Sequence, residues 1–451
     1  MQFCKAQQVF DFEQPDWSKD PELFIVDQIF NQFPEIFNLA APCFSNLDHH
    51  HHIGRTGMTL EQVIRCAIYM KRKRLSYREL SLHTADSKMG MVFMKMAYGQ
   101  SFSYQTLQQN ISKITAAVLY DINVAICRLA IELKVDDGKK MRSDSTAIMS
   151  DIHYPTNCSL LWDCIRVCSR ILKKAAKLFV ALKLTHYQRS AKKLNFQIVN
   201  TKGQEQRIPL FKKMLRIQHN YINYAQQAID YLSQLHINDP IIDAERINFL
   251  VQLQELLPKL EQIYSVAYRR EILNEQVPIA EKLFSIFETH TDYIQKGRRN
   301  PIFGHKINLT SGKSNLIFDI IIERGNPNDK TYFNPTLDNV RNNYQLVPRD
   351  YTTDGGFASF DNLQDALNKG VKNIVFTKSK GKLQNIVSSK RMETMLKNWR
   401  SGIEAIISNF KRGLDAQRCN WKGYPRFQSF LLWNVITFNL FVIASNILNK
   451  L

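Results

Sequence analysis

The sequence predicts an α/β protein in which a mixed β-sheet is interrupted by a large helical insertion and preceded by a helical N-terminal domain. Runs with strand character occur at 141–154 and again at 303–377. Between them lie roughly 140 residues of long amphipathic segments with few turn signals. Residues 59–115 also place apolar side chains at helical spacing. These three observations predict the class and the order of its parts.

Composition and charge indicate a globular protein with a polyanionic partner. The 451 residues allow two or three domains, and 44% hydrophobic with 22% charged residues is typical of a folded chain. The net charge of +19 favours nucleic acid first and an acidic membrane surface second. A soluble basic protein without such a partner is the remaining interpretation of charge alone.

The N-terminal region, 1–58, carries four prolines and many aromatic residues, and we expect an irregular arm. Its run His49–His52 could bind a metal, but consecutive histidines converge poorly on one ion, so a solvated loop or a tag remnant is favoured. No export signal is visible at the start, and the eight cysteines include no CxxC pair, which predicts reduced thiols in the cytoplasm. The apolar run Phe430–Leu448 is interrupted by polar residues, so we expect a buried core helix and no membrane span.

Residues 59–135 are expected to form a helical, helix-turn-helix-like domain. One helix follows Thr59, Ser76–Glu79 fits a capping box for a second, and Ser103 caps a third. The segment 103–115 is the candidate recognition helix. An ordinary helical bundle explains the same pattern nearly as well.

The insertion, expected at 158–298, is strongly basic in its first third. A solvated helix face explains these charges about as well as DNA does. The basic residues are Lys173, Lys174, Lys177, Lys183, Arg189, Lys192 and Lys193.

Sheet character resumes at Phe303 with a hairpin across Gly312. We then expect a helix at 335–344, a strand at 344–351 ending near Asp354, a helix at 361–369, a strand at 372–377 and a helix at 391–411. Asp319, which alternates within the second hairpin strand, is expected to face solvent.

The helix at 391–411 presents Arg400, Glu404 and Lys411 on one face, because helical geometry separates neighbours in this set by about 40° and about 20°. An ion-pair ladder would look the same. However, Asp354 precedes a Gly pair at a strand end, and Asp144 lies in a similar run upstream. Three acids from two strand ends and a helix are the parts that could hold two divalent cations.

These runs resemble the signature of bacterial insertion-sequence DDE transposases of the tyrosine-arginine-glutamate-lysine type. The similarity covers 141–170 and 300–445 well and 59–130 loosely. It departs at Lys397, where the signature has tyrosine. The resemblance implies a ribonuclease H-like catalytic domain at 136–157 and 299–451.

The resemblance further implies two Mg²⁺ ions, with Mn²⁺ as a substitute, held by the catalytic residues Asp144, Asp354 and Glu404. Asp144 would bridge both ions, and carboxylates are apt ligands for Mg²⁺. DNA-binding roles fall to Arg400, Lys411 and Lys397. The implied partners are transposon ends and target DNA, with a homodimer in the synaptic complex of a nucleoid-associated bacterial protein.

Two other functions stay open: a ribonuclease H-like nuclease without strand transfer, and a catalytically inactive DNA-binding descendant. Rival site residues are set aside on local grounds. Asp163 starts a helix, where an acid is ordinary, and lone strand histidines are usually structural. Trp399 and Trp421 could stack on a base, although packing is the commoner use. The histidines concerned are His153 and His305.

Overall fold

The computed structural model describes residues 15–44, 57–97, 99–182, 185–295, 300–377 and 383–450. His49–His52 and Lys183, singled out above, lie outside these ranges. The chain forms two compact units, one of residues 1–151 with 294–451 and the other of residues 152–293. Each is described by itself.

The first unit contains a mixed sheet in the order β2-β3-β1-β5-β6, with β4 also paired to β3. β1 runs antiparallel to β3 and parallel to β5, and β5 runs parallel to β6. The mixed sheet and its many helices are consistent with a ribonuclease H-like transposase. The strands are β1 (Lys140–Met149), β2 (Asp292–Ile294), β3 (Ile302–Ser311), β4 (Ile317–Ile322), β5 (Asp350–Asp354) and β6 (Asn373–Thr377).

The predicted hairpin is confirmed, since β3 and β4 pair antiparallel. The strand expected at 344–351 is displaced, because Gln345 adopts the left-handed conformation that ends α12 and β5 begins only at Asp350. The helices and turns after the hairpin are η5 (Asp329–Tyr332), α12 (Phe333–Tyr344), η6 (Gly355–Phe357), α13 (Phe360–Asn368), α14 (Lys390–Arg400), α15 (Gly402–Ser408), the π-helical turn η7 (Asn409–Gly413) and α16 (Tyr424–Leu448).

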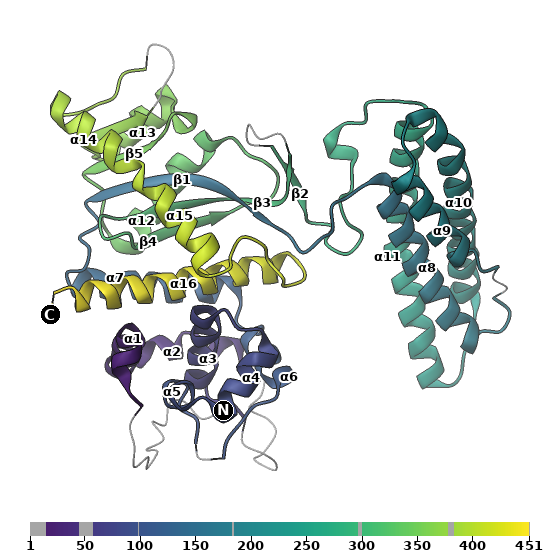
Figure 1. Cartoon of the computed structure of the whole chain (residues 1–451), viewed down its shortest axis with the longest axis horizontal. Helices are drawn as coiled ribbons and strands as arrows, with labels where there is room; N and C mark the ends of the chain where they lie inside the picture. Colours follow the sequence, from purple (N-terminus) through teal and green to yellow (C-terminus); the bar gives the residue numbers. More distant parts are fainter. Residues whose placement is uncertain are drawn as a thin grey trace. The chain divides into compact units, whose positions relative to one another are not determined.

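The N-terminal helices do not form a separate unit, because they share one hydrophobic core with the sheet and α16. α16 packs along α7 and against α1 and α3 (Figure 1). The arm expected to be irregular is helical in its described part, where Asp20 caps α1 and Leu23, Val26 and Phe30 are buried. The elements are η1 (Trp17–Lys19), α1 (Pro21–Gln32), α2 (Glu35–Asn38), η2 (Ala41–Cys43), α3 (Leu60–Lys73), α4 (Tyr77–Asp86), α5 (Lys88–Phe93), α6 (Tyr104–Ile111) and α7 (Ala116–Glu132).

α16 is the one single helix in the described ranges that is long and apolar enough to cross a membrane. Most of it is buried in the core, as expected. Its polar side chains are satisfied internally: Thr437 donates to the Trp433 carbonyl oxygen, and Asn439 donates to Asn123 and to the Ile317 carbonyl oxygen. These bonds remove the cost of burying amides and hydroxyls within an apolar helix.

The second unit is a helical bundle with its own core, and it follows β1 where a helical insertion was expected. Cys158, Cys164 and Cys168 are buried in it, and burial raises the pKa of each thiol. They pack as small apolar side chains. The helices are α8 (Asn157–Leu178), α9 (Gln188–Asn200), α10 (Gln204–Gln234), α11 (Pro240–Glu271) and the short turn η4 (Ile279–Glu281).

Candidate active site

The candidate site is centred on Asp144, which lies near the middle of β1. Strand alternation puts Arg142 and Asp144 on one face of the sheet and Ser143 and Ser145 on the other. Arg142 and Asp144 contact α14, while Ser143 bonds to the Tyr351 hydroxyl. The α14–α15 segment therefore covers the face of β1 that carries Asp144 (Figure 1).

Asp354 lies beside Asp144 at the end of the neighbouring parallel strand. Ser143 is paired with Thr353, so one further step in the register brings Asp144 alongside Asp354. Adjacent strands lie about 4.8 Å apart. The Asp354 carboxylate accepts a hydrogen bond from the Thr377 hydroxyl at 3.2 Å. The register thus places two of the three predicted acids on neighbouring strands, each following the last paired residue of β1 and β5.

Arg400 connects Asp144 to the third acid. Its Nη2 lies 2.7 Å from Oδ2 of Asp144, and its Nη1 lies 3.4 Å from Oε1 of Glu404. Arg400 is buried, whereas the Glu404 side chain is 70% exposed. One guanidinium therefore neutralises a half-buried carboxylate and holds an exposed one nearby.

The helix predicted at 391–411 is broken at Ser401, between α14 and α15. At this break the Arg142 guanidinium lies against Gly402, where an added Cβ would meet Nη1 at 2.3 Å. Arg142 also donates to the Trp399 carbonyl oxygen and to Asn315. The buried Arg142 guanidinium thus fills the space beside Gly402 and bonds to the Trp399 carbonyl oxygen near the end of α14. The single helix face that was expected to carry Arg400, Glu404 and Lys411 is therefore interrupted.

Arg142 is the important residue at this site whose role the sequence reasoning missed. Its guanidinium carbon lies 4.4 Å from the centre of the Trp399 ring, and Lys140 contacts the same ring. The signal that could have identified Arg142 is its position two residues before Asp144, because strand residues i and i+2 lie on the same face of a sheet. Trp399 consequently serves packing, the commoner use considered above.

A glycine after Asp354 is required by a close approach. A Cβ at Gly356 would lie 2.9 Å from the Asp329 carboxylate. Asp329 itself pairs with Lys306 at 2.8 Å and accepts a hydrogen bond from Ser145. This acid therefore supports the turn after β5 from the face of β1 opposite Asp144.

The carboxylates have the chemistry to hold divalent cations, but their observed arrangement is not a ready-made metal site. Within the described ranges, no three His, Cys, Asp or Glu side chains are grouped to hold an ion. The Arg400 guanidinium instead contacts both Asp144 and Glu404. The donor set fits Mg²⁺ or Mn²⁺, and binding one would require Arg400 to release the carboxylates.

The two predicted DNA-binding lysines have local partners. Lys397 Nζ pairs with Glu393 at 2.6 Å on the surface of α14. Lys411 donates to the Ala147 carbonyl oxygen at 2.8 Å and so ties η7 to β1. Their roles on DNA stay predictions.

The expectation that Asp319 faces solvent is wrong. Its side chain is buried in β4, accepts a hydrogen bond from the Tyr120 hydroxyl at 2.7 Å and contacts the Asn339 amide. Burial raises the pKa of Asp319 to about 6. The alternation in β4 failed as a guide because the face that carries Asp319 is covered by α7 and α12, whose Tyr120 and Asn339 contact this side chain.

The other rivals have structural surroundings. His305 is buried against the rings of Tyr424 and Phe427. In the second unit, Asp163 is buried and pairs with Arg166 at 2.8 Å and with His153 at 3.5 Å. None of these contacts involves the three acids.

Residues 284–440 match the sequence model of the family described as "Transposase DDE domain". The matched segment contains Asp354, Arg400 and Glu404 but not Asp144. No curated protein and no solved structure matches the chain. The match supports a DDE transposase, a class of metal-dependent enzymes that cleave DNA.

Proposed function

We propose that this protein is a transposase of the insertion-sequence kind. It would bind inverted repeats at transposon ends, cleave there and join the freed 3′-hydroxyl to target DNA. The observation that carries the proposal is the position of Asp144 on β1 next to Asp354 at the end of β5, with Glu404 linked to Asp144 through Arg400.

Asp144, Asp354 and Glu404 would hold two Mg²⁺ ions, with Mn²⁺ as a substitute. Bound ions would activate the attacking oxygen and stabilise the leaving oxygen of an in-line phosphoryl transfer. Asp144 is assigned as the shared ligand, as the resemblance to DDE transposases implies. Movement of the exposed Glu404 side chain is inexpensive, because its contact with Arg400 is long and solvated.

Arg400 would contact DNA once bound metal ions neutralise the acids. Its buried guanidinium would donate to a phosphate oxygen at the scissile position, where charge-assisted hydrogen bonds are strong. Lys397 would give up an exposed ion pair with Glu393 worth about 0–1 kcal/mol to reach flanking phosphate. Lys411 would serve mainly by holding η7 against β1 beside the DNA path.

The direct test is a strand-transfer assay with a labelled, precut duplex ending in the inverted repeat that flanks the reading frame. Label joined covalently to a plasmid in the presence of Mg²⁺ supports a transposase. Nicked plasmid without joining supports a nuclease. Specific binding without any Mg²⁺- or Mn²⁺-dependent cleavage supports an inactive DNA-binding descendant. Joining two ends at once is expected to need a homodimer, which sizing of the DNA complex measures.

A further inference from the structure

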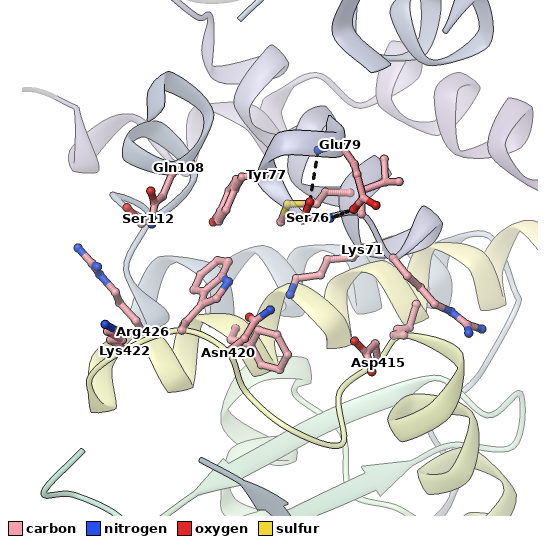
Figure 2. Close-up of a pocket in the computed structure, with 16 residues that line it drawn as sticks. Lys71, Ser76, Tyr77, Glu79, Gln108, Ser112, Asp415, Asn420, Lys422 and Arg426 are labelled. Carbon is pink, nitrogen blue, oxygen red and sulfur yellow. Dashed lines mark hydrogen bonds between the residues drawn. The ribbon is translucent and has the colours of Figure 1, made fainter. Parts of the chain in front are cut away.

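A cavity of about 500 Å³ lies in the first unit, and none of the three acids lines it. Figure 2 shows the side chains of its walls. Its walls come from α3, α4, the end of α6, the loop after η7 and the start of α16. The side chains used below are Lys71, Arg74, Tyr77, Trp421, Lys422 and Arg426.

Lys71 is the unusual group in this cavity. It is only 7% exposed, and its side chain extends into the cavity between Tyr77 and Asn420 (Figure 2). In the described part of the chain, no oxygen accepts a hydrogen bond from its Nζ and no carboxylate pairs with it. Instead, Nζ lies 3.7 Å from the centre of the Phe430 ring and 5.1 Å from that of Trp421.

The Lys71 side chain is buried, but its amine opens into the cavity, where the Asp415 carboxylate also favours the charged form, so Nζ can donate to a ligand that enters. Burial lowers the pKa of Lys71 to about 7, so the charged and neutral forms coexist near neutral pH. Both forms carry N–H donors. The cavity thus offers a donor at its inner end to a group that brings oxygen or nitrogen acceptors.

The walls beside this donor are aromatic and the rim is basic. The Tyr77 and Trp421 rings are nearly parallel, with centroids 6.1 Å apart. Lys422 and Arg426 are exposed at the opening, and Arg74, which follows α3, donates to the Gly413 carbonyl oxygen. The lining includes two carboxylates, Glu79 and Asp415, and the first of these is engaged in the cap of α4.

We infer that this cavity binds one unpaired nucleotide, with its base inside and its phosphate at the rim. The base would stack on the Trp421 or Tyr77 ring and accept a hydrogen bond from Lys71, in the way that the O6 and N7 atoms of guanine accept hydrogen bonds from lysine. The phosphate would stay partly solvated between Lys422 and Arg426, which avoids burying its charge. The nucleotide could belong to a DNA strand or be free in solution. The inference rests on the proposed function for the source of the nucleotide in a DNA strand. The chemistry by which the cavity would bind a nucleotide does not depend on that function.

The experiment measures binding of the full chain, without divalent metal, to a 5′-labelled single-stranded oligonucleotide and to free deoxyguanosine monophosphate. Fluorescence anisotropy reads the first ligand, and quenching of tryptophan emission reads the second. We expect Lys71→Met and Trp421→Leu each to weaken oligonucleotide binding about tenfold. Lys372→Met, on an exposed lysine beside β6, carries the same charge change and should bind as the wild type does.

Unchanged binding by both cavity variants, with wild-type thermal unfolding, would overturn the inference. If Trp421→Leu fails to fold, Arg426→Gln at the exposed rim replaces it, with weaker binding expected and unchanged binding contradicting. Oligonucleotide binding without monophosphate binding assigns the site to a DNA strand, and the reverse assigns it to a free nucleotide. Strand transfer is measured separately for each variant. If both cavity variants transfer strands as the wild type does, the proposed function stands even when the binding experiment overturns this site.

Discussion

Arg400 donates a hydrogen bond from Nη2 to Oδ2 of Asp144 at 2.7 Å, and the same guanidinium faces Glu404. The arginine therefore supplies the positive charge that two neighbouring carboxylates need when no other cation is close. A buried ion pair of this kind is strongly destabilised when one partner alone is removed. The guanidinium and a divalent cation are consequently competitors for the same oxygens.

This competition predicts that Arg400→Gln binds Mn²⁺ more tightly than the wild type while cleaving DNA more slowly. Removing a cation in contact with the Asp144 carboxylate should raise Mn²⁺ affinity about tenfold, as titrated by electron paramagnetic resonance. Lys397→Gln removes the same charge from an exposed pair with Glu393 and should leave affinity unchanged. Equal affinities for the Arg400 variant and the wild type would show that the guanidinium does not occupy a cation's place.

The junction of α14 and α15 gives a stability prediction. Gly402→Ala places a methyl group 2.3 Å from Nη1 of Arg142, which is itself fixed by Asn315 and Trp399. We expect the free energy of unfolding to fall by about 1–3 kcal/mol, measured in urea.

Gly413→Ala is the matched control for this substitution. Nothing lies within 4 Å of a Cβ built at Gly413, so its effect should stay within about 0.5 kcal/mol. A loss of stability at Gly413 equal to that at Gly402 would mean that backbone freedom, and not the Arg142 contact, decides the result.

Asp319 gives a pH prediction. Its pKa is raised from the ordinary value near 3.8 to about 6, so the folded protein holds a proton there that the unfolded chain has lost. The contribution of the protonated form to stability is fully present below about pH 3.8 and is lost as the pH rises through 6. The loss amounts to up to about 3 kcal/mol.

Asp319→Asn should therefore become more stable relative to the wild type as the pH rises from 4 to 8. Its amide oxygen can still accept the hydrogen bond from Tyr120. The difference in unfolding free energy between the two proteins, followed by urea titration at each pH, measures this. A difference independent of pH would show that the carboxyl is not held protonated by burial.

The sequence predicted the parts of the fold that local patterns specify. Alternation and turn residues located β3 and β4, and capping residues located α3, α4 and α6. Patterns failed where tertiary contacts decide. Asp319 alternates like a surface residue but lies under α7, and the helix through Arg400 is broken because Arg142, over 250 residues earlier, packs against Gly402.

The residues of the candidate site likewise fall into those that local sequence patterns could predict and those that only tertiary contacts reveal. Of the two acids expected at strand ends, Asp354 ends β5 as predicted, whereas Asp144 lies near the middle of β1, which continues to Met149. The sequence could not show that Arg400 contacts both Asp144 and Glu404. Helical spacing gives the angle between side chains on one helix and not their contacts with a strand. Lys411 likewise bonds to a backbone oxygen of β1, a partner that no spacing indicates.

The central claim is that Asp354 is a direct ligand of a catalytic divalent cation, and a metal-preference switch tests it most directly. Thiolate sulfur favours softer ions than Mg²⁺, so Asp354→Cys should lose cleavage of an inverted-repeat duplex in Mg²⁺ and recover part of it in Mn²⁺. Asp361→Cys, at an exposed position on α13, should cleave in both ions as the wild type does. An Asp354→Cys protein that folds normally and keeps wild-type cleavage in Mg²⁺, or that stays inactive in both ions, would contradict the claim.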